Sequence, residues 1–136
     1  YYSWYGIHGF EPYVTVMGTG AEKVSCFRSA TDDVVNIAYP TGRMGQLHLL
    51  RDGWTYTGYV LPEKPKDKKN PVVVADGYPG YEPLLREIVA FFRTGVVPFP
   101  PEETLEIFAL MEAAEMSAKR GGAPVTLAEA LSAARK

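Results

Sequence analysis

The spacing of apolar residues changes from the period of a strand to the period of a helix near Pro83, and this change limits the folds that the chain can adopt. Between residues 22 and 76, apolar and polar residues alternate in short stretches, which is the period of a β-strand. From Pro83 onward, apolar residues recur every three or four positions, which is the period of an amphipathic helix. A block of strands followed by a block of helices favours an α+β fold over an alternating parallel fold.

The alternating block predicts strands at residues 23–29, 34–39, 44–51, 54–61 and 72–75. Turn-forming residues separate the first four strands, at 31–33, 40–42 and 52–53. Connections this short join antiparallel neighbours, so we predict an open, mainly antiparallel β-sheet. Gly58 suggests a β-bulge in the fourth strand, and the lysine-rich segment 62–71 is predicted to be a solvated loop.

Helices are predicted on both sides of the strand block. In the first, over residues 4–17, the residues at helical spacing are Ile7, Phe10, Val14 and Met17. Pro12 predicts either a kink in this helix or a first regular turn that begins near Pro12. The later helices are expected at residues 83–95, 101–121 and 126–131, the last opened by a capping box formed by Thr126 and Glu129.

The stripes of the last two helices predict which side chains they bury. In the helix that begins at Pro101, the inward residues should be Leu105, Phe108, Met111 and Ala114. In the last helix, they should be Leu127, Ala130 and Leu131. Helices packed on one face of the sheet leave the other face uncovered, so we expect a homo-oligomer, a dimer, through that open face.

The composition sets the class of protein. A chain of 136 residues with 46% apolar residues can bury one core, and we expect a single domain. With 14 basic and 16 acidic residues, the net charge of −2 does not favour binding to nucleic acid or to a membrane. The one cysteine, Cys26, lies among strand formers, so we expect it to be buried and inert, with neither a disulfide nor a multi-thiolate zinc site.

The apolar runs and the first residues of the sequence bear on the location of the protein. No apolar run reaches the roughly 20 residues that a membrane-spanning helix requires, and the first residues lack the pattern of a signal peptide. We therefore expect a cytoplasmic protein, with export left open. The chain opens without methionine in a cluster of aromatic residues, which we interpret as a cut within a longer protein.

No dinucleotide-binding or phosphate-loop motif occurs in the chain. Gly18, Thr19 and Gly20 lead into a predicted strand, whereas a dinucleotide fingerprint must follow a strand and open a helix. We therefore expect this chain alone to bind neither a nucleotide cofactor nor a metal.

His8 and Glu11 are the strongest candidates for chemistry. They lie three residues apart in the first predicted helix, hence on nearly the same face. Such a pair serves as a general acid/base with its orienting carboxylate, or as two ligands of a metal site. The alternative is a structural histidine, hydrogen-bonded in a core or at a subunit contact. His48, in an alternating strand, is predicted to be a surface residue of the sheet.

Aromatic residues provide candidates for substrate binding. Trp4, Tyr5 and Tyr78 could line the apolar faces of a sugar-like substrate, or they could serve packing alone, and Glu11 is a further candidate for contact with the substrate.

Two stretches of the sequence resemble a known family. They are residues 4–11 (WYGIHGFE) leading to residues 16–20 (VMGTG), and residues 81–92 (YEPLLREIVAFF) with 98–114 and 121–127. These stretches resemble the C-terminal domain of the Gfo/Idh/MocA oxidoreductases. The resemblance implies an α/β domain with an open sheet that mediates dimers or tetramers, joined to a Rossmann domain that this chain lacks.

The resemblance also implies an activity and a set of residues. The family transfers hydride between NAD or NADP and a sugar, inositol or related polyol. His8 matches the histidine of the family's Asp-x-x-x-His pair, but Trp4 stands where the aspartate would be, and Glu11 does not occupy that position. The sequence Glu63-Lys64-Pro65 spells the family's lysine motif without a Rossmann unit before it, so we do not expect Lys64 to be catalytic.

Two functions therefore remain open. The first is the substrate-binding and oligomerisation domain of an NAD(P)-dependent oxidoreductase, inactive without its nucleotide-binding domain. The second is a non-catalytic dimerisation or interaction domain in which His8 is structural.

Overall fold

A computed structural model describes residues 5–52, 57–60, 72–76 and 80–134. The chain divides into two compact units, one formed by Tyr1–Asp52 with Phe99–Lys136 and the other by Gly53–Pro98. Trp4, Tyr78, the predicted loop 62–71 and the first residues of the predicted strand 54–61 lie outside the described residues.

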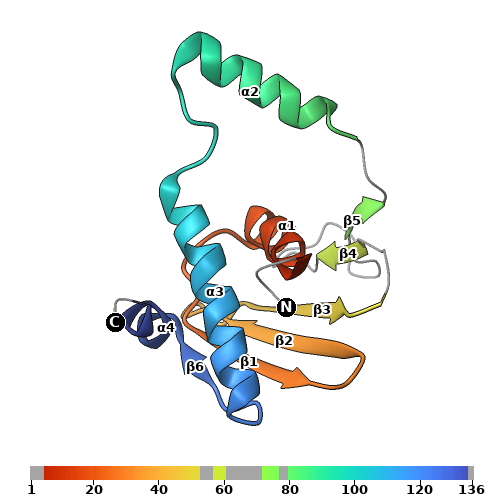
Figure 1. Cartoon of the computed structure of the whole chain (residues 1–136), viewed down its shortest axis with the longest axis vertical. Helices are drawn as coiled ribbons and strands as arrows, with labels where there is room; N and C mark the ends of the chain where they lie inside the picture. Colours follow the sequence, from red (N-terminus) through yellow and green to blue (C-terminus); the bar gives the residue numbers. More distant parts are fainter. Residues whose placement is uncertain (1–4, 53–56, 61–71, 77–79, 135–136) are drawn as a thin grey trace. The chain divides into compact units, whose positions relative to one another are not determined.

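The first unit is an open sheet with helices, and the predicted α+β fold is confirmed (Figure 1). Its elements are α1 (Ile7–Met17), β1 (Lys23–Arg28), β2 (Asp32–Ala38), β3 (Met44–Leu50), α3 (Pro101–Lys119), β6 (Val125–Thr126) and α4 (Leu127–Ala133). The four strands pair antiparallel in the order β3-β2-β1-β6. The first three form the predicted meander, whereas the two-residue strand β6 was not predicted.

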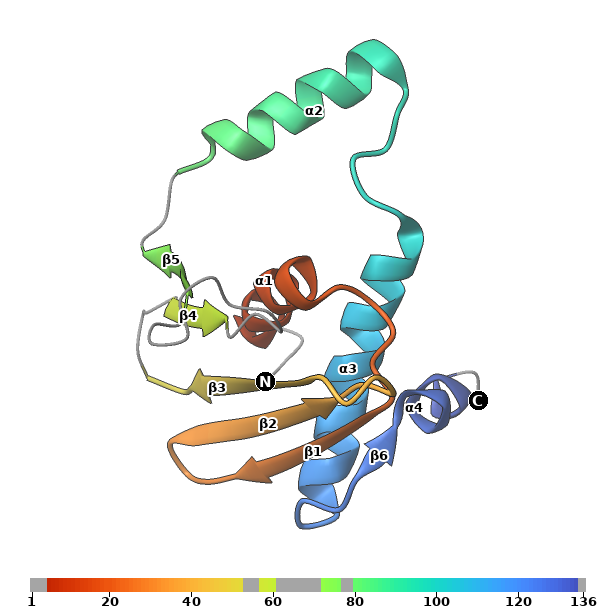
Figure 2. The same ribbon diagram turned by 180° about the vertical axis from the view of Figure 1, so that it is seen from behind.

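The core lies between one face of the sheet and the helices. Helix α3 packs on β1, and α1 packs on β3 and α3 (Figures 1 and 2). Alternate strand residues are fully buried on this face, at Val24, Cys26, Val35 and Ile37. The buried position of Cys26 is as predicted. The residues between them, such as Ser25, Phe27 and Asn36, belong to the opposite, open face of the sheet.

Two glycines lie where α1 approaches β3. A Cβ atom on Gly9 would lie 2.4 Å from Cδ2 of Leu49, and one on Gly45 would lie 2.3 Å from the ring of Tyr13. At Gly9 the nearest atom is the end of the flexible Leu49 side chain, which can shift, whereas at Gly45 three atoms of the Tyr13 ring and hydroxyl stand in the way, so glycine at position 45 allows the close approach of α1 to β3. The helix runs through Pro12 from Ile7, which excludes the alternative that it begins near Pro12.

The burial predicted for the last two helices was partly wrong. Leu105 and Phe108 are 60% and 54% exposed, and Leu131 is also exposed. The residues that α3 buries begin one turn later, at Ala109, Leu110, Met111, Ala113, Ala114 and Ser117. Periodicity identifies an apolar stripe, but it does not tell how much of the helix length the sheet covers. The predicted cap of α4 is present, because the Thr126 hydroxyl accepts a 3.1 Å hydrogen bond from the Glu129 amide.

The second unit contains an antiparallel pair of strands and one helix. Strands β4 (Thr57–Val60) and β5 (Val72–Asp76) correspond to the last two predicted strands, and their register shifts between Thr57 and Gly58, where a bulge was predicted. Helix α2 (Glu82–Thr94) ends at Gly95, whose positive φ of 72° favours glycine. None of the described helices is long and apolar enough to cross a membrane.

Candidate acid/base site on helix α1

His8 and Glu11 form a pair at the surface of α1. Nδ1 of His8 lies 2.9 Å from Oε2 of Glu11, and both side chains are 49% exposed. An ionised carboxylate can only accept a hydrogen bond, so Nδ1 of His8 carries the proton and donates. In the neutral imidazole, Nε2 then holds the lone pair. The pair therefore has the arrangement of a base with its orienting carboxylate.

Tyr5 completes the described part of this site. Its ring meets the His8 imidazole edge-on, with a centroid distance of 5.8 Å and an angle of 67° between the planes. Tyr5 is itself about half exposed, so it presents an aromatic surface next to the imidazole. Of the other predicted substrate-binding residues, Glu11 belongs to the pair above, whereas Trp4 and Tyr78, like Lys64, lie outside the described residues.

The amphipathic pattern of α1 places this pair on the outside. The helix buries Phe10, Tyr13 and Val14, so His8 and Glu11 lie on its opposite side. Pro12 has no N–H to donate to the His8 carbonyl one turn earlier. Because this helix hydrogen bond is missing, the packing of Phe10, Tyr13 and Val14 in the core holds α1, and with it the pair of His8 and Glu11, in place.

The metal interpretation of this pair gains no support from the described residues. A metal site requires at least three ligands, and no cluster of three or more histidine, cysteine or carboxylate side chains occurs in the part of the chain that the structure describes. His8 and Glu11 would supply two.

The glycine-rich segment after α1 does not fit a nucleotide phosphate. The amides of Gly20 and Ala21 donate to the two carboxylate oxygens of Glu106, at 2.7 and 2.9 Å. A phosphate-binding loop needs backbone N–H groups that point to the ligand. In this segment a carboxylate from α3 already occupies those N–H groups.

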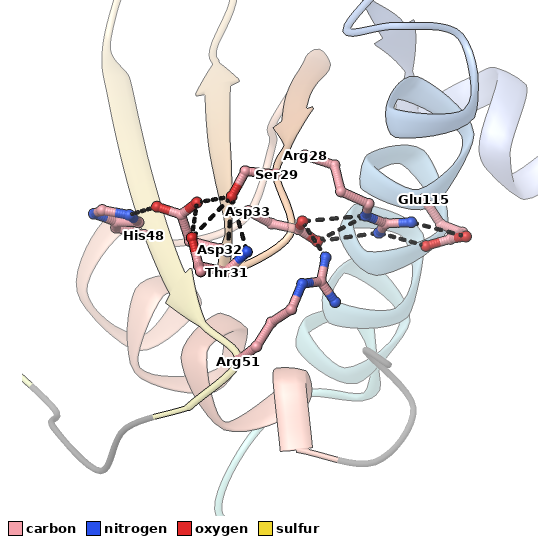
Figure 3. A network of polar contacts seen from close by, with 8 residues as sticks. All are labelled: Arg28, Ser29, Thr31, Asp32, Asp33, His48, Arg51 and Glu115. Carbon is pink, nitrogen blue, oxygen red and sulfur yellow. Dashed lines mark hydrogen bonds and ion pairs between the residues drawn. The ribbon is translucent and has the colours of Figure 1, made fainter.

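A second polar group, which the sequence analysis missed, surrounds the buried carboxylate of Asp33 (Figure 3). Arg28 donates to Oδ2 through Nη2 at 3.0 Å, and Arg51 donates to Oδ1 through Nη2 at 2.7 Å. Arg28 also donates to Glu115 of α3 at 2.7 Å. Two guanidinium groups and two carboxylates thus balance one another and join β1, β2, the end of β3 and α3.

The neighbouring Asp32 belongs to the opposite face of the sheet (Figure 3). Oδ2 of Asp32 lies 2.5 Å from Nε2 of His48, and its Oδ1 accepts a hydrogen bond from the Ser29 hydroxyl. The Ser29 hydroxyl, and after it His48, hold the pKa of Asp32 below its ordinary value. His48 is more than half exposed, as predicted for a surface residue of the sheet.

This group does not have the order of a nucleophilic triad. The carboxylate of Asp32 stands between the serine and the histidine, whereas activation of a serine requires the imidazole to contact the hydroxyl. Ser29 also accepts from the amides of Thr31 and Asp32, which shapes the turn between β1 and β2. We therefore interpret this group as structural.

Strand alternation was the signal that could have found Asp33. Residues 31–33 were predicted to be a turn, but β2 begins at Asp32. Extending the alternation back from Ile37 and Val35 puts Asp33 on the core face. A buried carboxylate requires a cation, and Arg28 and Arg51 stand at the ends of the adjacent strands.

The ion pair of Glu115 predicts a pH dependence of stability. Arg28 lowers the pKa of Glu115 from its ordinary value of 4.5. A lowered pKa in the folded state stabilises the fold above the ordinary value, and this contribution is lost as the pH falls through the folded-state pKa. Glu115→Gln should therefore lower the free energy of unfolding at pH 7 by about 0.5–1 kcal/mol, with the difference from wild type vanishing in acid.

Urea unfolding from pH 7 to pH 3 measures this effect. Glu112→Gln, at an exposed position of the same helix, is the control and should change little at any pH. The same pH dependence in both variants would contradict a role for the pair of Arg28 and Glu115.

Comparisons of the chain with protein-family models, with curated proteins and with solved structures find no match. What the chain does must therefore be inferred from its own side chains.

Proposed function

We propose that this chain is the substrate-side domain of an NAD(P)-dependent oxidoreductase that acts on a hydroxyl group of a sugar, inositol or related polyol. The observation that carries this proposal is the exposed pair of His8 and Glu11, whose Nδ1 and Oε2 atoms lie 2.9 Å apart, because with the proton on Nδ1 the Nε2 atom of the imidazole can accept a proton. The resemblance of residues 4–20 and 81–127 to the Gfo/Idh/MocA C-terminal domain supports the reaction class. The proposal includes a cytoplasmic location and a nucleotide-binding domain outside this chain.

In this proposal His8 moves the proton of the reaction. Oxidation of an alcohol to a carbonyl removes the proton from the hydroxyl oxygen and a hydride from the carbon that bears this oxygen. Nε2 of His8 accepts the proton, and Glu11 stabilises the imidazolium that forms. The nicotinamide, when bound by the other domain, supplies the hydride acceptor. In the reverse direction, the imidazolium returns the proton to the alkoxide.

Glu11 takes the orienting role that the resemblance assigns to an aspartate. Trp4 stands at the aspartate position, one turn before His8, and cannot accept a hydrogen bond from the imidazole. Glu11 reaches the same imidazole from three residues after it, at 2.9 Å. The carboxylate that holds the tautomer thus comes from the opposite direction along the helix.

The open face of the sheet favours a second candidate, a non-catalytic dimerisation domain. Phe27 and Met44 are 58% and 69% exposed on this face, and Leu50 is also exposed. Burial of these side chains against a second copy would stabilise a dimer. His8 would then be a surface residue paired with Glu11 for local stability alone. Substitution of His8 discriminates the two candidates, because only the first requires it for turnover.

The parent reading frame and its activity test the proposed function. We expect the frame to encode a dinucleotide-binding domain before this chain, and the whole protein to reduce NAD or NADP with a polyol from a panel. His8→Gln should lower kcat/KM by about 10²–10⁴-fold, because a positioned acid/base contributes that much. His48→Gln, which removes the other histidine, is the matched control and should leave kcat/KM unchanged.

The tautomer of His8 can be measured on this chain alone, without the nucleotide-binding domain. Imidazole ¹⁵N spectra should report the tautomer with the proton on Nδ1 of His8, and Glu11→Gln should shift the tautomer populations. A reading frame without a dinucleotide-binding domain, or full activity in His8→Gln, would contradict the proposal.

A further inference from the structure

A hollow lies on the open face of the four-stranded sheet, at one end of its strands. Its volume is about 180 Å³. Strands β1, β2 and β3 and the segment before β6 line it, with the side chains of Lys23, Ser25, Asn36, Ala38, Met44 and Pro124. The core and α1 lie on the other side of the sheet, so the hollow is separate from the pair of His8 and Glu11.

The hollow is remote from the places where the chain passes between the two units. At this end of the strands Ala38 pairs with Met44, whereas Asp32 pairs with Leu50 at the other end. The chain leaves the first unit after Asp52, next to that other end, and it returns at Phe99, which leads into α3 on the core side of the sheet. Residues of the first unit alone therefore form the hollow.

Small side chains on the open face create the hollow. Across the strands, Ala38 stands between Met44 and Lys23. The register of β1 and β6, continued by one residue, places Pro124 opposite Ser25. Larger side chains thus surround two small ones, and Met44 and Pro124 give the hollow an apolar wall.

The polar side-chain groups in the hollow are hydrogen-bond donors. Oδ1 of Asn36 accepts a 2.8 Å hydrogen bond from Nε2 of Gln46, so Nδ2, which can only donate, is left for the hollow. The ammonium of Lys23 can only donate, and the Ser25 hydroxyl can donate as well. None of these three groups has a hydrogen bond or an ion pair with the part of the chain that the structure describes, and no carboxylate lines the hollow.

Donors around one positive charge, beside an apolar wall, suit a carboxylate with a short alkyl group. The two carboxylate oxygens can accept from the ammonium of Lys23 and from Ser25 and Asn36 at the same time. The alkyl group would remove apolar surface of Met44 and Pro124 from water. A phosphate dianion fits less well, because Lys23 balances only one of its two charges.

We propose that this hollow binds a small aliphatic carboxylate, held by Lys23, Ser25 and Asn36, with its alkyl group against Met44 and Pro124. The site goes beyond the proposed oxidoreductase function, because it shares no residue with the pair of His8 and Glu11. It requires neither a nucleotide nor a second domain, so it can be tested on this chain alone.

Titration of the ¹⁵N-labelled chain with butanoate tests the site. The Ser25 backbone amide and the Asn36 side-chain amide should shift in a saturable way, with a dissociation constant of about 1 mM. Butanamide has a similar shape without the charge and should bind about tenfold more weakly or worse. Inorganic phosphate should also bind about tenfold more weakly or worse, because its second charge is not balanced.

Lys23→Met and Lys119→Met are the matched variants. Lys23→Met keeps most of the side chain but removes the charge, so it should weaken butanoate binding about tenfold or more, with an unchanged far-ultraviolet dichroism spectrum. Lys119→Met removes a lysine of α3 that pairs with Glu115, outside the hollow, and should leave binding unchanged.

Three results would overturn the proposal. The first is the absence of saturable shifts at Ser25 and Asn36, which would also follow if another part of the chain covered the hollow. The second is equal affinity of the wild-type chain and Lys23→Met for butanoate, or of the wild-type chain for butanoate and butanamide. The third is equal or tighter binding of phosphate, which would refute the carboxylate as the ligand class.

Discussion

Replacing Asp33 by alanine is expected to lower the free energy of unfolding by about 3–5 kcal/mol. The carboxylate is fully buried and accepts hydrogen bonds from both Arg28 and Arg51. Its removal takes from both guanidinium groups, which are 30% and 25% exposed, the buried carboxylate that they share, while Arg28 keeps its pair with Glu115. Most single domains have only about 5–15 kcal/mol of stability, so this loss would be a large part of the total.

Urea unfolding at pH 7 measures the change, and the neighbouring aspartate is the control. Asp32→Ala removes the surface contacts of this carboxylate with His48 and Ser29 and should cost much less than Asp33→Ala. A further variant replaces the charges together, with Asp33→Leu, Arg28→Met and Arg51→Met, and should recover most of the lost stability. Equal losses in Asp33→Ala and Asp32→Ala would contradict the importance that we assign to the buried charge.

The same aspartates show where sequence patterns reach their limit. Aspartate favours turns, so residues 31–33 were predicted to connect two strands. The structure instead extends β2 to Asp32, because Arg28 and Arg51, at the ends of the two adjacent strands, compensate the charge of Asp33. Local propensity predicts a turn from the residue type alone, whereas tertiary ion pairs can place the same residue in a strand.

Local signals were sufficient where the contact itself is local. The three-residue spacing of His8 and Glu11 predicted a shared helix face, and the structure places them 2.9 Å apart. The cap formed by Thr126 was predictable for the same reason. By contrast, Glu106 binds the amides of Gly20 and Ala21 from 86 and 85 residues away, and no sequence spacing announces such a contact.

The position of α1 depends on contacts of this distant kind. His8 is presented at the surface because Phe10, Tyr13 and Val14 hold the other side of the helix against the sheet. The period of the apolar residues predicted the buried side, but the closeness of the approach depends on a glycine in β3. A substitution at that glycine should therefore affect both the stability of the fold and the placement of the candidate site.

Gly45→Val is expected to lower the free energy of unfolding by about 3 kcal/mol or more. A Cβ at this position would lie 2.3 Å from Cε2 and from the hydroxyl oxygen of Tyr13, so α1 or the ring must move. The ring has little freedom, because Tyr13 is buried in the core. Burial, and after it the neighbouring Tyr39 hydroxyl, raise the pKa of Tyr13, so the group stays neutral.

A double-mutant cycle separates this clash from a general effect of valine in the strand. With Tyr13→Ala the space beside Gly45 is open, so Gly45→Val should cost less than about 1 kcal/mol in that background, an interaction energy of about 2 kcal/mol. Urea unfolding of the four proteins gives these values, and imidazole spectra of His8 report whether α1 has moved. Additive losses in the double variant, together with an unchanged His8 spectrum, would show that Gly45 does not set the approach of α1 to β3.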